Sequence, residues 1–354
     1  MKKFDPAFIT DFREYTKDRQ PDFDNLLRVL NRKKPERSTL FEFFLNERLE
    51  MFIAGAQEWP EDPMERQALR IKAFRMAGYD YCTISAAPMS FPSNKSNHGK
   101  SSLNINENPI ITDRKSYENY PWPDPDACDD GRVGRYGALL PEGMKIISQS
   151  ADGVLENVMD LIGYDGMCYL LADDPVFLQE LFDNVGSRLV RYYELAARYD
   201  CIGAFVANDD WGFATQTFLS PADMRKYVFP WYKKIVEAAH GSGRPVLLHS
   251  CGQLRDVYDD VIDALHFDAK HSYEDKIWPV EKAYKALYPR IAVLGGIDVD
   301  FICRRGHEEI YDRACNMLRL GAAGGYALGS GNSIPGYVPF EGYLAMTCAA
   351  LVNT

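Results

Sequence analysis

The sequence has no long apolar run, and no run of Lys and Arg stands out among its 354 positions. No stretch approaches the roughly 18 uninterrupted apolar residues that a membrane-spanning helix requires, so we expect no membrane span. The N-terminal segment has two lysines but no apolar stretch after them, which predicts the absence of a signal peptide. The formal net charge of −11, without a prominent basic run, disfavours binding to nucleic acid.

The cysteine pattern does not resemble a disulfide framework. Eight cysteines are scattered along the chain, many of them inside apolar runs. In a cytosolic chain of this length, such cysteines are typical of reduced core residues. We therefore expect a soluble, globular protein of the cytoplasm.

What the sequence does contain is a repeated strand–helix pattern. Short apolar runs predict strands near residues 81–84, 145–148, 202–207, 246–249, 267–270, 291–294 and 325–328. Most of these runs are followed by helical periodicity, which implies an α/β fold with a parallel sheet. A strand count close to eight favours a (β/α)8 TIM barrel. No glycine-rich phosphate-binding motif follows the first strand, which disfavours a dinucleotide-binding open sheet.

We expect the whole chain, residues 1–354, to form one barrel domain with two additions. Residues 1–78 are interpreted as a helical N-terminal extension. A helix is expected over residues 63–76, and apolar residues recur earlier at helical spacing at Phe41, Phe44, Leu45 and Leu49. Residues 85–130 are rich in Pro, Ser, Asn and Gly, and a loop of this length is typical of an active-site loop or lid.

Polar side chains gather where the expected strands end. These positions are Asn208, Asp209, Asp210, His249, Cys251, Lys270, His271, Tyr273, Glu274, Asp298, Ser330, Asn332 and Ser333. The opposite strand ends carry far fewer titratable groups. Since catalytic groups of a barrel come from the carboxyl ends of its strands, the asymmetry predicts one active site at that rim.

The strongest single motif is the His-Ser-Cys-Gly sequence at residues 249–252. His249 and Cys251 are two residues apart at the end of a strand, and alternate residues of a strand point the same way. They can therefore bind one metal ion together. Two such ligands do not complete a zinc site, so other residues must contribute.

Several rim residues also have a purely structural interpretation. Because neighbouring strand residues face opposite ways, we expect only one of Asp209 and Asp210 to face the pocket, while the other caps a turn. The turn at residues 329–333 either is no more than a tight turn or brings backbone N–H groups to an anion.

Lys270 needs a partner, because an unpaired ammonium at the end of an apolar strand is costly to bury. Glu274 or Asp298 would supply the counter-charge. Asp298 is equally well placed to cap the helix that follows it.

Several short motifs occur together in the second part of the chain. They are Tyr120-Pro121-Trp122-Pro123-Asp124, Leu219-Ser220-Pro221, Phe229-Pro230, His249-Ser250-Cys251-Gly252, Gly295-Gly296-Ile297-Asp298 and the turn at 329–334. In this combination the chain, from about residue 117 onward, resembles the uroporphyrinogen decarboxylase superfamily, which includes corrinoid-dependent methyltransferases. The family fold is a (β/α)8 barrel, in agreement with the strand count.

The resemblance implies a zinc site with one substitution. In the zinc-dependent methyltransferase branch, a His-x-Cys pair and a distant third cysteine bind zinc, which activates a thiol acceptor. His249 and Cys251 match the pair, but residues 331–333 read Gly-Asn-Ser where the third cysteine is expected. The third ligand would then be one of Asp209, His271, Glu274 and Asp298.

The resemblance further implies methyl transfer between a cobalamin and a small-molecule acceptor or donor. The sequence has no Asp-x-His-x-x-Gly corrinoid-binding signature, so the cobalamin is expected on a partner corrinoid protein. A homodimer is consistent with the resemblance. The expected catalytic residues are Asp209, Asp210, Lys270, His271, Glu274 and Asp298, and the expected substrate-binding residues are Asn208, Asn332 and Ser333.

Two other functions stay open. The first is decarboxylation of a porphyrinogen-like or small carboxylic acid. The decarboxylase branch holds substrate carboxylates with an Arg-rich, Gly-containing motif, and the helix with Arg66, Arg70 and Arg75 lacks it. The second is a non-catalytic ligand-binding barrel, against which the acidic rim and the His-x-Cys pair argue.

Overall fold

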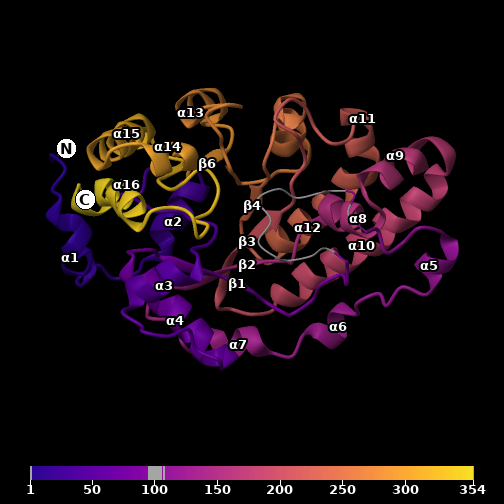
Figure 1. Ribbon diagram of the computed structural model, residues 1–354, viewed down its shortest axis with the longest axis horizontal. Coiled ribbons are helices and arrows are strands. Elements are labelled where there is room, and N and C mark those ends of the chain that lie inside the picture. Colours follow the sequence, from indigo (N-terminus) through magenta and orange to yellow (C-terminus); the bar gives the residue numbers. More distant parts are fainter. Residues whose placement is uncertain (1, 95–105, 107, 354) are drawn as a thin grey trace.

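Seven parallel strands in sequence order form the centre of the molecule, whose computed structural model describes residues 2–94, 106 and 108–353 (Figure 1). The strands are β1 (Tyr81–Ser85), β2 (Lys145–Gln149), β3 (Ile202–Asn208), β4 (Val246–His249), β5 (Ala269–His271), β6 (Ala292–Leu294) and β7 (Tyr326–Ala327). Each lies within a residue or two of a predicted strand. The parallel α/β architecture is therefore confirmed, whereas the described residues contain no regular eighth strand.

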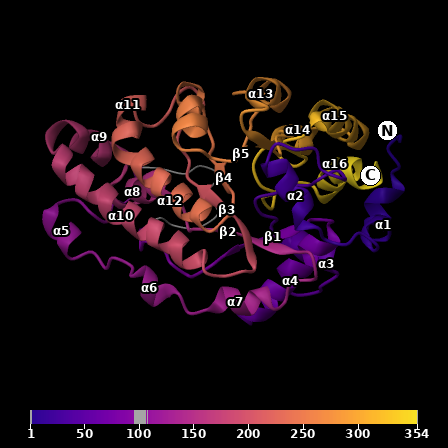
Figure 2. The ribbon, with the colours of Figure 1, turned by 180° about the vertical axis from the view of Figure 1, so that it is seen from behind.

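Helices join the strands and cover the sheet. Their bounds are α1 (Ala7–Thr16), α2 (Phe23–Leu30), α3 (Glu47–Ala54), α4 (Pro63–Met76), α5 (Arg114–Glu118), α6 (Pro125–Cys128), α7 (Arg132–Gly137), α8 (Val154–Ile162), α9 (Tyr164–Asp173), α10 (Pro175–Ala196), α11 (Pro221–Asp223), α12 (Phe229–Gly241), α13 (Val280–Leu287), α14 (Val299–Arg304), α15 (His307–Leu320) and α16 (Phe340–Val352). Helices α8, α10 and α12 lie on one side of the strands, and α1 and α16 lie on the other (Figures 1 and 2). None of the described helices combines the length and the hydropathy that crossing a bilayer would take.

Residues 39–46 are extended, which corrects the predicted helical spacing of Phe41, Phe44, Leu45 and Leu49. The helix α3 begins only at Glu47, behind an Asn46 cap. The Phe41 N–H donates to the Leu328 carbonyl (2.8 Å), and isolated parallel bridges join Leu40 to Leu328 and Leu45 to Ile334. The segment thus adds an irregular strand beside β7. Its hydrogen bonds reach nearly 300 residues along the chain, so local periodicity could not reveal them.

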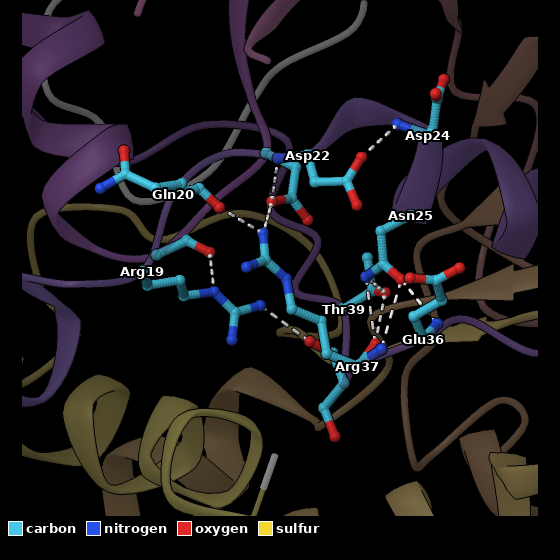
Figure 3. Close-up of polar contacts among 11 residues, drawn as sticks. Arg19, Gln20, Asp22, Asp24, Asn25, Glu36, Arg37 and Thr39 are labelled. Atoms are coloured by element: carbon cyan, nitrogen blue, oxygen red, sulfur yellow. Dashed lines mark hydrogen bonds and ion pairs between the residues drawn. The ribbon is translucent and has the colours of Figure 1, made fainter. Parts of the chain in front are cut away.

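A polar network ties the entry of this segment to α2 and to the residues just before it (Figure 3). The Asn25 side chain donates to Thr39 Oγ1 (2.9 Å), and the Arg37 guanidinium donates to the Gln20 carbonyl (2.7 Å). Arg37 also forms an ion pair with Asp80, whose side chain is only 2% exposed. The network therefore sets where the extended segment meets the sheet.

The amphipathic stretch after Gly252 is less regular than predicted. A short 3₁₀ helix covers Arg255–Val257 and a π-helix covers Asp260–Ala264, in place of one continuous α-helix. Its apolar side chains are nevertheless buried, as the pattern indicates, at Leu254, Val257, Tyr258, Val261, Ile262 and Leu265.

The long segment at residues 85–130 holds short helices, α5 and α6. Part of this predicted loop, residues 95–105 and 107, lies outside the described residues. All eight cysteines are unpaired, in line with the expected lack of disulfides, and among them Cys168 is exposed.

Candidate active site

Strands β3, β4 and β5 present one row of polar side chains at their carboxyl ends. The sheet register pairs Asn208 with His249, and His249 with His271. Paired residues of parallel strands project from the same face of the sheet, so these three side chains point the same way. His249 and His271 are both buried, and their ring centroids are 4.9 Å apart.

Asp209, the next residue of the chain, faces the surrounding helices. Its carboxylate accepts hydrogen bonds from the N–H groups of Leu155 (2.9 Å) and Glu156 (2.8 Å) at the start of α8. It also accepts from the Tyr232 hydroxyl (2.7 Å) and from Trp211 Nε1 (2.9 Å). Burial raises the pKa of Asp209 to about 7. With both oxygens engaged in this way, Asp209 holds α8 against the sheet.

Asp210 instead joins His249 and Cys251. One potential ligand atom from each of the three lies within 4.8 Å of the others. The Cys251 N–H donates to Asp210 Oδ1 (2.7 Å), and Cys251 Sγ is 4.0 Å from His249 Nε2. Among the described residues, this group has the donor atoms and spacing of a metal site. Of the adjacent aspartates, only Asp210 therefore faces the site, as the alternation predicted.

The sulfur of Cys251 accepts hydrogen bonds from two side chains. Ser272 Oγ and Asn332 Nδ2 each donate to it over 3.3 Å. Burial, followed by the nearby Asp210 carboxylate, raises the pKa of the thiol above its usual range. Gly252 follows with φ +86°, and a side chain there would run into the backbone of Gly212. The glycine therefore lets the cysteine turn approach the loop after β3.

Behind His249 runs a chain of buried polar groups. His249 Nδ1 lies 2.8 Å from His271 Nδ1, and His271 Nε2 lies 3.3 Å from the Ser330 carbonyl. The Ser330 N–H and hydroxyl donate to the two carboxylate oxygens of Glu42, each over 2.6 Å. Burial lowers the pKa of His249 to about 4 and that of His271 well below its ordinary value. Both imidazoles are therefore neutral at physiological pH.

Lys270 points away from this row and has a different partner from the one predicted. Its ammonium donates to the carbonyls of Ser250 (2.9 Å) and Ser272, and it lies 4.6 Å from the centre of the Tyr273 ring. Burial lowers its pKa to about 8. In the described part of the chain, neither Glu274 nor another carboxylate forms an ion pair with it. Lys270 therefore ties together the two loops that surround Cys251.

A cavity of about 310 Å³ opens beside Asn332. Its lining includes four of the predicted catalytic and substrate-binding residues, Glu274, Asp298, Asn332 and Ser333. Asp298 accepts from the Phe301 N–H (3.1 Å), so it caps α14 as one interpretation expected. Burial, followed by the Asp298 charge, raises the pKa of Glu274.

Sequence reasoning missed Glu42 and Ser272. Glu42 lies in the run Thr-Leu-Phe-Glu-Phe-Phe, where an acid among apolar residues is a signal of a buried, hydrogen-bonded carboxyl group. Ser272 carries no comparable signal. Asp210 was predicted as a catalytic residue, whereas the predicted third metal ligands were four other residues, so the group of Asp210, His249 and Cys251 corrects that prediction. The place of Asp210 depends on the pairing of β3 with β4.

Comparisons with known proteins agree with this architecture. The model of the uroporphyrinogen decarboxylase (URO-D) family matches residues 151–350. A methyltransferase from Methanosarcina mazei has a similar fold, with a TM-score of 0.72 at 15% identity over 92% of this chain and 97% of that chain. This likeness supports a TIM-barrel-type α/β fold.

A curated relative, the uroporphyrinogen decarboxylase of Myxococcus xanthus (strain DK1622), is 25% identical over 174 residues. The alignment covers 47% of this chain and 44% of the relative, so the chain spans less than half of the relative's length. The family match, in contrast, extends over more than half of the chain and includes the whole Asp210, His249 and Cys251 group. The chain therefore belongs to the uroporphyrinogen decarboxylase family.

Proposed function

We propose that the protein is a metal-dependent methyltransferase. It moves a methyl group between a cobalamin, carried by a partner corrinoid protein, and a small-molecule acceptor or donor. The observation that carries this proposal is the convergence of Asp210, His249 and Cys251 at the carboxyl ends of β3 and β4. The family and the fold shared with a methyltransferase support it.

The three side chains fit a zinc ion. Catalytic zinc binds imidazole, thiolate and carboxylate ligands, and typically uses three protein ligands with one position open. The low pKa of His249 leaves its imidazole free of a second proton, so one ring nitrogen is available to a metal. In this proposal Asp210 takes the place of the third cysteine of the zinc-dependent branch.

Zinc, when bound, would supply Lewis acidity that keeps an acceptor thiol in its nucleophilic thiolate form. The hydrogen bonds from Ser272 and Asn332 favour the deprotonated, ligating form of Cys251, because they stabilise charge on its sulfur. Asp210 and deprotonated Cys251 together carry the charge that balances a divalent cation.

The neighbouring cavity is the proposed substrate site. Asn332 connects the cavity with the group of Asp210, His249 and Cys251. Its side-chain amide donates a hydrogen bond to the Cys251 sulfur, and Asn332 also lines the cavity. Glu274 is the proposed general acid, because its raised pKa lets it keep a proton at a higher pH than an exposed glutamate does. Ser333 would help to orient the substrate from the same wall.

Decarboxylation is the second candidate function, favoured by the identity with the Myxococcus relative. The cavity argues against a substrate with several carboxylates. Among the described residues that line it, Lys276 is the one cation, whereas Asp298 and Asp300 are two acids in addition to the proposed general acid Glu274. Such a wall repels a polyanion, so we place methyl transfer first.

The proposal is tested with purified protein, zinc and methylcobalamin. The protein is expected to bind about one zinc per chain and to demethylate methylcobalamin with a thiol acceptor, followed by the visible spectrum of the corrinoid. Cys251→Ser is expected to lose both properties. Cys168→Ser is the matched control, because Cys168 is exposed and away from the site.

Full demethylation activity in metal-free protein would exclude the zinc proposal. Lack of demethylation with thiol, folate and phenol acceptors would count against methyl transfer as a whole. Release of carbon dioxide from a porphyrinogen or a small acid would establish the second candidate instead.

A further inference from the structure

The imidazole rings of His249 and His271 contact each other through their Nδ1 atoms. The two atoms lie 2.8 Å apart, at hydrogen-bond distance. A neutral imidazole has one N–H donor and one lone-pair acceptor, so this contact restricts which nitrogen of each ring carries the proton. One Nδ1 must donate and the other must accept.

The Ser330 carbonyl decides between the two arrangements. A carbonyl oxygen only accepts, so His271 Nε2, 3.3 Å away, must carry the proton of that ring. His271 is buried, and within the described part of the chain its ring contacts no carboxylate that could balance a second proton, so its Nδ1 keeps a lone pair. His249 Nδ1 must then be the donor. The remaining nitrogen of His249, Nε2, is left unprotonated, and it is the one 4.0 Å from Cys251 Sγ.

The surroundings keep both rings in these orientations. Phe43 stacks on His249 with centroids 4.4 Å apart, and Phe41 meets His271 edge-on at 4.9 Å. Glu42, between these two phenylalanines, holds both the N–H and the hydroxyl of Ser330. The extended segment at residues 39–46 therefore supports the imidazole pair by packing and, through Ser330, by hydrogen bonds.

We propose that His271 is a positioning residue that keeps His249 protonated on Nδ1, so that the Nε2 lone pair faces Asp210 and Cys251. Ser330 and Glu42 hold His271 in place for this role. The consequence for metal binding rests on the proposed function, whereas the proton position is a property of the metal-free chain. Ligating histidines are commonly oriented by a hydrogen bond that the other ring N–H donates, and loss of its acceptor typically costs about 10- to 100-fold in metal affinity.

The first measurement is the proton position in metal-free wild-type protein. Selective ¹⁵N labelling of the six histidines, with long-range ¹H–¹⁵N spectra, shows which nitrogen of each ring carries the proton. We expect His249 to be protonated on Nδ1 and His271 on Nε2. A wild-type spectrum with His249 protonated on Nε2 would overturn the proposal without any variant.

The second measurement compares variants of His271. His271→Phe keeps an aromatic ring but removes the acceptor, so we expect His249 to shift its proton toward Nε2 and the zinc affinity to fall by about 10- to 100-fold in chelator competition. His271→Gln offers a carbonyl acceptor and should restore part of that affinity. His307→Phe, at an exposed histidine, is the matched control and should bind zinc as the wild type does.

The outcomes separate the two proposals. Wild-type protein that binds no zinc, yet shows His249 protonated on Nδ1 and a shifted proton in His271→Phe, refutes the metal site and supports the positioning role. If His271→Phe binds zinc as tightly as the wild type does, and His249 has the same proton position in both proteins, the positioning role is refuted. That result still supports the metal site.

Discussion

Asp209 and Asp210, which follow β3, have different structural roles. Asp210→Asn keeps an oxygen for the Cys251 N–H but loses the charge that a metal ligand provides. We expect its zinc affinity to fall at least about tenfold, with a change of less than about 1 kcal/mol in the free energy of unfolding. Chelator competition and urea unfolding measure the two quantities.

Asp209→Asn is the counterpart of that variant and should behave in the opposite way. The carboxylate accepts from two backbone N–H groups of α8, a tyrosine hydroxyl and an indole. An amide replaces one acceptor oxygen with a donor, so buried donors lose their partner at a cost of about 1–3 kcal/mol. Zinc affinity should be retained. Equal zinc loss in both variants would contradict this division of roles.

Glu42 makes stability depend on pH in a specific direction. Burial raises its pKa from the ordinary 4.5 to about 8, against the opposing effect of its bonds to Ser330. Between these values the folded state holds a proton that the unfolded chain lacks, so the free energy of unfolding falls as pH rises. Glu42→Gln removes this contribution. We expect the wild type to lose stability relative to Glu42→Gln from pH 5 to pH 8.

Urea unfolding of both proteins across that range is the measurement. The comparison separates Glu42 from Asp209, whose titration is common to the two proteins. Parallel pH profiles would show that Glu42 does not hold an extra proton in the folded state.

At the scale of secondary-structure elements, the strands and most helices followed from local pattern. The runs at 145–148 and 246–249 are apolar, short and followed by helical periodicity, and β2 and β4 lie there. Residues 39–46 are the instructive exception. Their apolar spacing also fits a helix, but partners in residues 328–334 satisfy their backbone groups, and no local pattern contains that information.

In the candidate site, too, some features were predictable from local sequence and others depend on tertiary structure. His249 and Cys251 were predictable, because they are two residues apart at the end of one strand and share its alternation. The contacts of Asp210 with that pair, and of His271 with Glu42 through Ser330, depend on strand order and on the extended segment. Those relations are tertiary, so the sequence indicated the residues but not their partners.

The anchoring of the extended segment gives a prediction at this scale. Arg37→Met leaves the buried Asp80 carboxylate without its cation and removes the bond to the Gln20 carbonyl. We expect a loss of about 1–3 kcal/mol in the free energy of unfolding, because the buried carboxylate loses its ion-pair partner and keeps only the Asp22 N–H and the charge of Arg19. Arg28→Met is the matched control. Its ion pair with Glu36 is exposed and should be worth at most about 1 kcal/mol. Similar losses in urea unfolding would contradict this role of Arg37.

At the scale of the whole molecule, the site draws on segments far apart in the chain. Asp210 and Cys251 follow β3 and β4, Asn332 follows β7, and Glu42 comes from the N-terminal segment. Their arrangement exists only in the folded sheet, because the unfolded chain separates them. A metal held by this site is therefore a ligand of the folded state.

That linkage predicts stabilisation of the entire fold by zinc. At a free zinc concentration of 100 times the dissociation constant, the free energy of unfolding should rise by about 2.7 kcal/mol. Thermal unfolding should show a higher midpoint with zinc and a return to the original value with a chelator. Cys168→Ser should respond as the wild type does, because its thiol is exposed and lies outside the donor group. Cys251→Ser should not respond, and a full zinc response in that variant would show that the stabilising metal binds elsewhere.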